Sequence, residues 1–394
     1  TAIVVRPVGK VLSFGGDDEE FMMKVGIIAD PLDVQSAGIH TFTRHLVEGL
    51  RRYGTNIELM VVRPGRGEVP AAGEYHIPVW AGVPGHQRVR QWTSIPDLLN
   101  RLRPDVVIEP AHFGPFCLSR GIRRVTVIHD LTPVLRPEWH GIGSVLAHRV
   151  LLPRVLRRAD AVVAVSQQTA ADIRHRFSKT GPEPEVIHPA IDDRFRPVPE
   201  AGVCQKYGIR GPFLLHVGTL EPRKNLPFLL TAWEDARREV GKDGQRLQLV
   251  LAGQWGWKTE SLRQRIAESE FTDDIILPGY VRDEDLPHLY SAALAMVFPS
   301  HYEGFGYPVA EALACGCRVL TSGQAALSEF NHDLISLFAL DDPTELKQII
   351  IQALQSEADP TNSEIIRNTD AFREAYSLRK MIAKWEAVLQ RLTS

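Results

Sequence analysis

Short apolar runs alternate with helical stretches along most of this chain. The runs are residues 24–29, 57–62, 105–110, 124–129 and 161–166 in the first half, and residues 213–218, 247–253, 274–279, 294–300 and 317–322 in the second. Stretches between them, such as residues 41–53, 89–102 and 167–177, repeat apolar side chains at helical spacing. Strands that alternate with helices form parallel sheets with helical crossovers. The pattern predicts an α/β fold of two doubly wound parallel sheets in tandem, with a ligand site in the cleft between them.

The domain boundary is predicted from a change in composition. Residues 187–200 are rich in Pro and Asp and fit neither a strand nor a helix pattern. A chain of 394 residues is also too long for one compact core and long enough for two domains of ordinary size. We expect an added or weakly ordered extension at residues 1–21, to which no function is assigned, then one domain over 22–195 and another over 196–375.

The composition limits the classes of function. Hydrophobic side chains make up 44%, charged ones 24%, and the formal net charge is −3, which is typical of a soluble globular protein and argues against a strongly basic nucleic-acid-binding chain. No apolar run approaches the roughly 20 residues that cross a bilayer, and the start lacks a basic region followed by an apolar core. Four cysteines without a C-x-x-C pair are expected to be reduced packing residues. We therefore expect a cytoplasmic protein whose membrane contact, if any, is peripheral.

Basic side chains are concentrated in the first half of the chain. Residues 22–200 hold 23 basic and 18 acidic side chains. One cluster, formed by Arg149, Arg154, Arg157 and Arg158, is interleaved with Leu151, Leu152, Val155 and Leu156. Two interpretations are open: an amphipathic helix lying on anionic lipid, or an ordinary helix with a solvated basic face, which we prefer.

Two carboxylates flank a glycine turn in the second half. Glu303 and Glu311 stand eight residues apart, with Gly304, Phe305 and Gly306 directly after the first and Pro308 opening a predicted helix. Glycines admit close approach of a ligand, helix N-termini attract phosphate, and a carboxylate accepts two hydrogen bonds from a vicinal diol. This combination indicates a sugar-nucleotide site at the carboxyl end of a strand. The alternative is a solvated turn acid and a helix-capping acid around a simple connection.

A pair of cations occupies the first strand-to-helix turn of the second sheet. Arg223 and Lys224 follow the strand at residues 213–218, which ends in Gly218, and precede a predicted helix. Both side chains suit a diphosphate and would neutralise its developing charge during bond cleavage. The alternative is a surface ion pair with Glu221.

The first sheet offers two weaker signals. Ser36, Ala37 and Gly38 form a strand-to-helix turn where Gly38 would admit a phosphate or sugar, although one glycine at such a turn often serves packing alone. His129 and Asp130 end a buried-looking strand, so His129 could bond a sugar while Asp130 orients it. A structural histidine satisfied by the backbone is the alternative.

Together these residues resemble the retaining glycosyltransferases of family 4, whose two-domain fold is known as GT-B. The resemblance extends from Met23 to the end, and its most specific elements are the Glu303–Glu311 motif and the EPRKN stretch with Arg223 and Lys224. It implies that Arg223 and Lys224 hold the donor diphosphate and that Glu311 holds the ribose hydroxyls. Glu303 would lie beside the transferred sugar, where the backbone amides of Gly304, Phe305 and Gly306 also approach.

The resemblance implies further roles. His129 would lie close to the donor sugar, Gly218 beside the donor, and Tyr280 and Val281 beside the nucleotide base. Residues 376–394 would form a helix that crosses back to the first domain. One position departs from the family pattern, because many members carry paired glycines where this chain has Ala37 and Gly38, which leaves the contribution of Gly38 open.

The implied reaction moves a hexose from a nucleoside diphosphate sugar to a hydroxyl with retained configuration. Neither a metal nor a cofactor is expected, because the two cations replace a metal. Same-face attack is preferred over double displacement through Glu303.

GDP-mannose is the first expectation for the donor and UDP-glucose the second, since EPRKN and HDLTP look most like bacterial mannosyltransferases of surface polysaccharide assembly. The acceptor would be a glycan or a lipid-linked oligosaccharide at the inner face of the membrane. A non-hydrolysing sugar-nucleotide epimerase and a non-catalytic sugar-nucleotide-binding partner protein are the alternatives.

Overall fold

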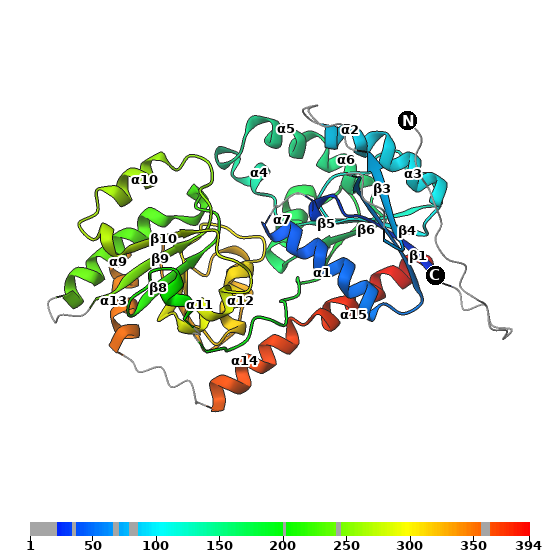
Figure 1. The fold of residues 1–394 in the computed structure, drawn as a ribbon. Coiled ribbons are helices and arrows are strands. Elements are labelled where there is room, and N and C mark those ends of the chain that lie inside the picture. Colours follow the sequence, from blue (N-terminus) through cyan, green and yellow to red (C-terminus); the bar gives the residue numbers. More distant parts are fainter. Residues whose placement is uncertain are drawn as a thin grey trace. The chain divides into compact units, whose positions relative to one another are not determined.

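The chain forms two compact units, each with its own parallel sheet (Figure 1). The computed structural model describes residues 22–33, 37–65, 71–78, 86–199, 202–241, 246–355 and 363–394. The first unit comprises Thr1–Ala190 together with Leu378–Ser394, and the second comprises Ile191–Ser377. The division after Ala190 falls inside the Pro- and Asp-rich segment, five residues before the boundary expected from composition.

The sheet of the first unit has seven described strands in the order β3-β2-β1-β4-β5-β6-β7, all parallel. Their bounds are β1 Met23–Ile28, β2 Ile57–Gly65, β3 Glu74–Pro78, β4 Val106–Glu109, β5 Arg123–Ile128, β6 Ala161–Ala164 and β7 Pro184–Val186. The central strands are buried on both faces, as a sheet covered by crossover helices requires.

The sheet of the second unit has six described strands in the order β10-β9-β8-β11-β12-β13, again all parallel. Their bounds are β8 Phe213–Val217, β9 Gln248–Ala252, β10 Ile275–Gly279, β11 Ala295–Phe298, β12 Val319–Thr321 and β13 Ile335–Leu337. The expected α/β architecture of two doubly wound parallel sheets is confirmed.

Helices separate the strands in both units. In the first unit they are α1 Ala37–Tyr53, α2 His86–Trp92, α3 Ser94–Leu102, α4 Thr132–Leu135, α5 Ile142–Val150, α6 Leu152–Arg158, α7 Gln167–Phe177 and α15 Leu378–Thr393. In the second they are α8 Val203–Lys206, α9 Leu226–Val240, α10 Glu260–Ala267, α11 Leu286–Ala292, α12 Tyr307–Ala314, α13 Pro343–Gln355 and α14 Ser363–Ala375. Short 3-10 turns include η1 Asp30–Leu32, η2 Pro137–Trp139, η3 Pro222–Lys224, η5 Thr272–Asp274 and η6 Ala325–Glu329.

Three strands and one helix break were not expected from the sequence. The strands β3, β7 and β13 lie at the edges of their sheets, where only one side is paired, so they lack a long apolar run. The helix expected over 89–102 is split at Thr93 into α2 and α3. Pro96 explains the break, because proline has no N–H for the bond to residue 92 and its ring clashes with that carbonyl group.

The final helix, α15, packs against α1 within the first unit. Trp385 is fully buried and its ring centroid lies 6.5 Å from that of Phe42 on α1. A Cβ atom at Gly49 would come within 2.6 Å of Ile382, so the absence of a side chain at Gly49 lets the two helices approach closely. Glu386 accepts hydrogen bonds from the backbone and hydroxyl of Thr55. These contacts hold α15 against α1 and the residue Thr55 that follows it.

Helix α6, which carries most of the basic cluster, is an ordinary helix with a solvated basic face. Leu152, Val155 and Leu156 are buried in the core of the first unit, while Arg154 and Arg157 are exposed. The alternative in which these apolar side chains lie on lipid is therefore wrong. Across the described ranges, none of the helices has the length and apolar character needed to span a membrane.

Each sheet has a point where its strand order reverses. In the first unit it lies between β1 and β4, and in the second between β8 and β11. Ligands of open α/β sheets bind outside the carboxyl ends of the strands at such switch points. In the second unit this position is occupied by the segments that follow β8 and β11, which carry Lys224 and Glu303.

Candidate active site

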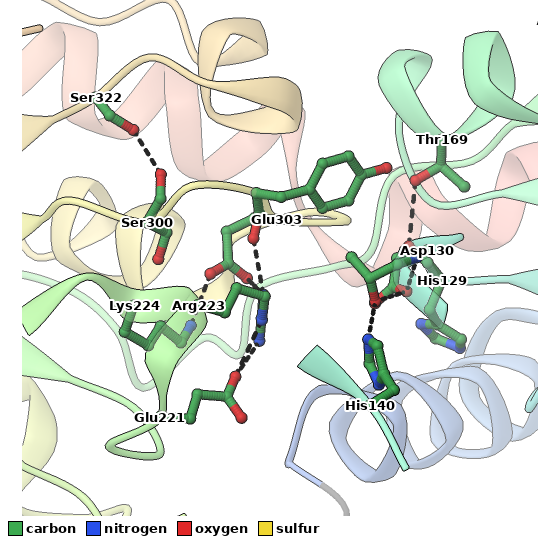
Figure 2. Close-up of polar contacts among 12 residues, drawn as sticks. His129, Asp130, His140, Thr169, Glu221, Arg223, Lys224, Ser300, Glu303 and Ser322 are labelled. Carbon is green, nitrogen blue, oxygen red and sulfur yellow. Dashed lines mark hydrogen bonds and ion pairs between the residues drawn. The ribbon is translucent and has the colours of Figure 1, made fainter. Parts of the chain in front are cut away.

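The switch point of the second unit brings Arg223, Lys224 and Glu303 together (Figure 2). Lys224 ends η3, which follows β8, and its Nζ donates to Glu303 Oε1 at 2.7 Å. Arg223 Nη1 lies 2.6 Å from Glu303 Oε2 and also donates to the carbonyl oxygen of Tyr302 at 2.9 Å. Both carboxylate oxygens of Glu303 are thus engaged by the two cations that the sequence singled out.

Burial makes this ion cluster electrostatically strong. Burial alone would raise the pKa of Glu303, but the charges of Arg223 and Lys224 reverse the effect and lower that pKa to about 2. Burial lowers the pKa of Lys224, and the charge of Glu303 opposes that shift. The ammonium group also lies 4.4 Å from the ring centroid of Phe298. Lys224 is only 5% exposed, which contradicts its interpretation as part of a solvated surface pair.

Glu221 fixes the orientation of Arg223, a role that the sequence reasoning missed. Its Oε1 accepts from Arg223 Nε at 3.0 Å and from Nη2 at 2.8 Å, and the carboxylate is almost fully buried. The sequence placed Glu221 only as the partner in an alternative surface pair. Its position two residues before Arg223 was a usable signal, because a short turn can bring such neighbours into contact.

Two glycines at the switch point are required by the local geometry. Gly218 has a φ of 143°, and a Cβ atom there would lie 3.5 Å from Lys224 Cε. Gly306, with a φ of 96°, directly precedes α12, and its Cβ would come within 2.6 Å of Leu327. Between Glu303 and α12, Gly304 and Phe305 complete the turn, with the Phe305 ring buried against Phe330. The expected glycine turn before a helix is present.

Glu311 lies on α12 and belongs to a second polar group. Its Oε2 accepts a hydrogen bond of 3.0 Å from the hydroxyl of Tyr290, a fully buried residue of α11. Burial raises the pKa of Glu311 to about 7; the charges of Asp283 and Asp192 add to the shift, while Tyr290 and Arg194 oppose it. Tyr290 is a further residue that the sequence reasoning missed.

The proposed base-binding residues follow β10. Val281 is buried, whereas Tyr280 is 59% exposed and its hydroxyl donates to Asp283 at 2.9 Å. Asp283 is one of the charges that act on Glu311. Tyr280 therefore lies near the polar group of Glu311. Glu303 belongs to the other polar group, in which it contacts Arg223 and Lys224 directly.

In the first unit, His129 is held by the backbone rather than by Asp130. Its Nε2 donates to the carbonyl oxygen of Pro110 at 2.7 Å, and its ring packs edge-on against Phe42 with centroids 5.1 Å apart. Asp130 Oδ1 accepts from the backbone and hydroxyl of Thr132 (Figure 2). The expected orienting role of Asp130 is thus taken by Pro110. Because burial lowers the pKa of His129, the ring is neutral and its Nδ1 can accept a hydrogen bond.

Two more histidines, both missed from the sequence, support His129. The backbone N–H of His129 donates to His112 Nε2 at 2.9 Å, so His112 carries its proton on Nδ1 and directs it to His148 Nε2 at 3.2 Å. His148 Nδ1 in turn lies 2.9 Å from the carbonyl oxygen of Ser144. Burial lowers the pKa of His112 to about 3, so the His112 ring is uncharged. His112 and His148 lie 36 positions apart, and no periodicity in the sequence predicts a contact between them.

Gly38 is the second residue of α1, at the start of the helix after β1. Phe42, one turn later, contacts His129. Ser36, the first residue of the predicted turn, lies outside the described residues. Glu109, at the end of β4, was not expected: it is 1% exposed, and burial raises its pKa well above the ordinary value.

Two family models together match most of the chain. "Glycosyl transferases group 1" matches residues 205–371 and "Glycosyltransferase Family 4" matches residues 36–195. The chain is 34% identical over 260 residues to the O-antigen chain mannosyltransferase B of Escherichia coli, which covers 64% of this chain and 67% of the relative. It is 30% identical over 247 residues to the serotype-specific mannosyltransferase WbdA of Escherichia coli, covering 60% of this chain but only 30% of that longer protein.

The fold has close counterparts among solved structures. HepE from Anabaena, solved in complex with UDP-glucose, superimposes with a TM-score of 0.70 at 16% identity and covers 94% of this chain and 100% of its own. At that identity the likeness concerns the fold alone. The family models, the relatives and the two parallel sheets agree: the chain belongs to the family 4 glycosyltransferases and has the GT-B fold.

Proposed function

We propose that this glycosyltransferase moves a hexose, in the first instance mannose, from a nucleoside diphosphate sugar to a hydroxyl with retained anomeric configuration. The observation that carries the proposal is the buried cluster of Arg223, Lys224 and Glu303 at the β8–β11 switch point. Two cations held in place before the ligand arrives can bind a diphosphate. They also stabilise the charge that appears as the sugar departs, without a cost of reorganisation. That task otherwise falls to a metal ion, so a metal is not part of the proposal.

The roles of the acids follow from their partners. Glu303 fixes both cations and lies at the glycine turn, where the transferred sugar would be bound. Since both of its oxygens are engaged, Glu303 is poorly placed as a nucleophile, which favours same-face attack over double displacement. Glu311 would accept the ribose hydroxyls, with Tyr280 and Val281 beside the base. His129 would offer its Nδ1 to a sugar hydroxyl.

The donor and acceptor are proposed by analogy. GDP-mannose is the first donor because mannosyltransferases are among the relatives, and UDP-glucose is the second because a structural neighbour binds it. The acceptor would be a glycan or lipid-linked oligosaccharide, since a relative is named for building an O-antigen chain. The four cysteines are not joined in disulfides, which suits a reducing compartment, and we propose that the reaction takes place in the cytoplasm.

A thermal-shift panel of nucleoside diphosphate sugars tests the proposal first. A ligand that binds the native state raises the unfolding temperature in proportion to ln(1 + [L]/Kd), so a shift with one base identifies the nucleotide. Product NMR with an added glycan acceptor then reports the anomeric configuration, with and without EDTA. Isomerised donor in the absence of acceptor would establish an epimerase, and binding without transfer over a broad acceptor panel would establish a non-catalytic binding protein.

A further inference from the structure

One buried histidine of the second unit has no role in the site described so far. His216 lies on β8 and is fully buried. Its Nδ1 lies 3.0 Å from the carbonyl oxygen of Val297 on the neighbouring strand β11, and because a carbonyl oxygen can only accept, Nδ1 carries a proton. Burial and, after it, the charge of Lys224 lower the pKa of His216 to about 4, so the ring is neutral. Its Nε2 is therefore an unprotonated acceptor.

This acceptor is buried without a hydrogen-bond partner among the residues that the structure describes. Burying a polar atom without a partner costs free energy, so the great majority of buried polar atoms in folded proteins are hydrogen-bonded. An exception at a ligand site has a specific explanation when the missing bond forms only in the ligand complex. The question is which donor His216 Nε2 would meet in that complex.

The ammonium group of Lys224 and His216 Nε2 border the same small space. A Cβ atom at Gly218 would lie 3.7 Å from Lys224 Nζ and 4.0 Å from His216 Nε2. Both side chains also pack on one ring, since the His216 ring stacks on Phe298 with centroids 5.4 Å apart and Lys224 Nζ lies 4.4 Å from the Phe298 centroid. The absence of a side chain at Gly218 keeps this position clear of an atom that would contact both groups.

We propose that His216 is a positioning residue for Lys224 in the donor complex. An ammonium group has three N–H donors. Lys224 Nζ would donate one to Glu303 Oε1, as it does in the structure, one to a diphosphate oxygen, and one to His216 Nε2. A small rotation of the end of the lysine side chain would make the third bond. The inference rests on the proposed function, because the diphosphate completes this arrangement.

A neutral acceptor suits this task better than a second carboxylate. Three acceptors around one ammonium group fix its position at the departing phosphate, which is the preorganisation that stabilises a developing charge. A further anion beside Lys224 would cancel part of the positive charge that the phosphate is meant to meet. The unprotonated nitrogen of His216 orients the ammonium group and leaves that charge intact.

Two substitutions separate the functions of the two ring nitrogens. His216→Asn puts an amide N–H near the position of Nδ1, where it can donate to Val297, and leaves no acceptor at the position of Nε2. His216→Gln puts its amide oxygen near the position of Nε2. With saturating donor, kcat should fall about tenfold or more in His216→Asn, because a hydrogen bond to a charged group is lost. In His216→Gln it should stay within about threefold of wild type, since an acceptor remains.

A double-mutant cycle shows whether His216 acts through Lys224. In the Lys224→Ala background, His216→Asn should cause little further loss of kcat, because the donor of the proposed bond is already gone. His332→Asn is the matched control: it changes another histidine of the second unit whose pKa is lowered by burial, and that ring packs on Phe372 of α14. Its kcat should equal that of wild type.

Nitrogen-15 spectra of histidine-labelled wild-type protein test the same bond without a substitution that could impair folding. The Nε2 signal of His216, assigned by its absence in His216→Gln, should move upfield on addition of GDP, or of UDP where GDP does not bind. The inference is overturned by unchanged kcat in His216→Asn, by an equal loss in His216→Gln, by an undiminished effect in Lys224→Ala, or by a signal that stays in place while the nucleotide binds. Wild-type protein that binds no nucleoside diphosphate or its sugars would instead overturn the proposed function, and this inference with it.

Discussion

Lys224 and Glu303 form a buried ion pair in which Nζ lies 2.7 Å from Oε1, although the two residues come from segments that follow different strands. The pair exists because β8 and β11 are neighbours at the point where the strand order reverses. Arg223 binds the other oxygen of the same carboxylate. The cations of the site are therefore fixed by the protein before any donor is bound, as electrostatic preorganisation requires.

Lys224→Ala should reduce kcat by about a hundredfold or more, because removal of one preorganised charge at a developing anion has effects of that size. Initial rates with saturating donor measure the effect. Lys347→Ala, which removes an equivalent cation paired with Glu239 in the same unit, is the control and should leave kcat unchanged. Unchanged turnover in Lys224→Ala would refute a role for this cation in stabilising the leaving group.

Glu221→Ala should lower kcat about tenfold or more, since hydrogen bonds to charged groups contribute about 1.5–3 kcal/mol and Arg223 loses two of them. Glu221→Gln keeps an acceptor oxygen and should fall between Ala and wild type. The expected loss is larger in kcat than in KM, because displaced cations stabilise the departing charge less well. A general destabilisation would instead lower the unfolding temperature while leaving the kinetics of the folded enzyme unaltered.

Parts of this site were predictable because they follow from strand ends. The apolar runs before Arg223 and Glu303 indicated buried parallel strands, and carboxyl ends of parallel strands share one edge of a sheet. Contacts between helices were not predictable in this way. Tyr290 and Glu311 meet because α11 packs on α12, and His112 meets His148 because a loop packs on α5. Such contacts depend on packing geometry, which periodicity alone does not specify.

In the fold as well, elements marked by a local sequence pattern were predictable, and features that depend on tertiary contacts were not. The buried central strands have apolar runs that can be identified in the sequence, whereas the edge strands β3, β7 and β13 are partly polar. The lipid-lying interpretation of residues 149–158 was drawn from an amphipathic pattern that also suits a core helix. Only the structure shows that Leu152 faces inward and Leu146 outward.

Glu303→Gln should destabilise the protein at neutral pH. The folded pKa of about 2 is below the ordinary value, so the ionised carboxylate stabilises the fold above pH ~4.5, and this contribution is lost as the pH falls through the folded pKa. A shift of this size corresponds to about 3 kcal/mol. Urea unfolding at several pH values should show a large difference between variant and wild type at pH 7 that shrinks toward pH 3. Glu260→Gln, at an exposed position, should show no such trend.

Binding of a nucleoside diphosphate sugar should strengthen about tenfold between pH 6 and pH 8, because only ionised Glu311 accepts both ribose hydroxyls and the pKa of that carboxyl is about 7. The stability of the free protein depends on pH in the opposite direction to donor binding. A raised folded pKa stabilises the free protein at low pH, and this contribution is lost as the pH rises through 7. Calorimetry with a diphosphate sugar isolates the effect, since its esterified diphosphate does not titrate in this range.

Glu311→Gln should bind the donor weakly with no pH dependence. Tyr290→Phe, which removes an interaction that lowers the pKa of Glu311, should move the midpoint of the pH dependence upward. Donor affinity that stays constant in Glu311→Gln while the rate collapses would show that Glu311 acts on the reaction and not on the ribose.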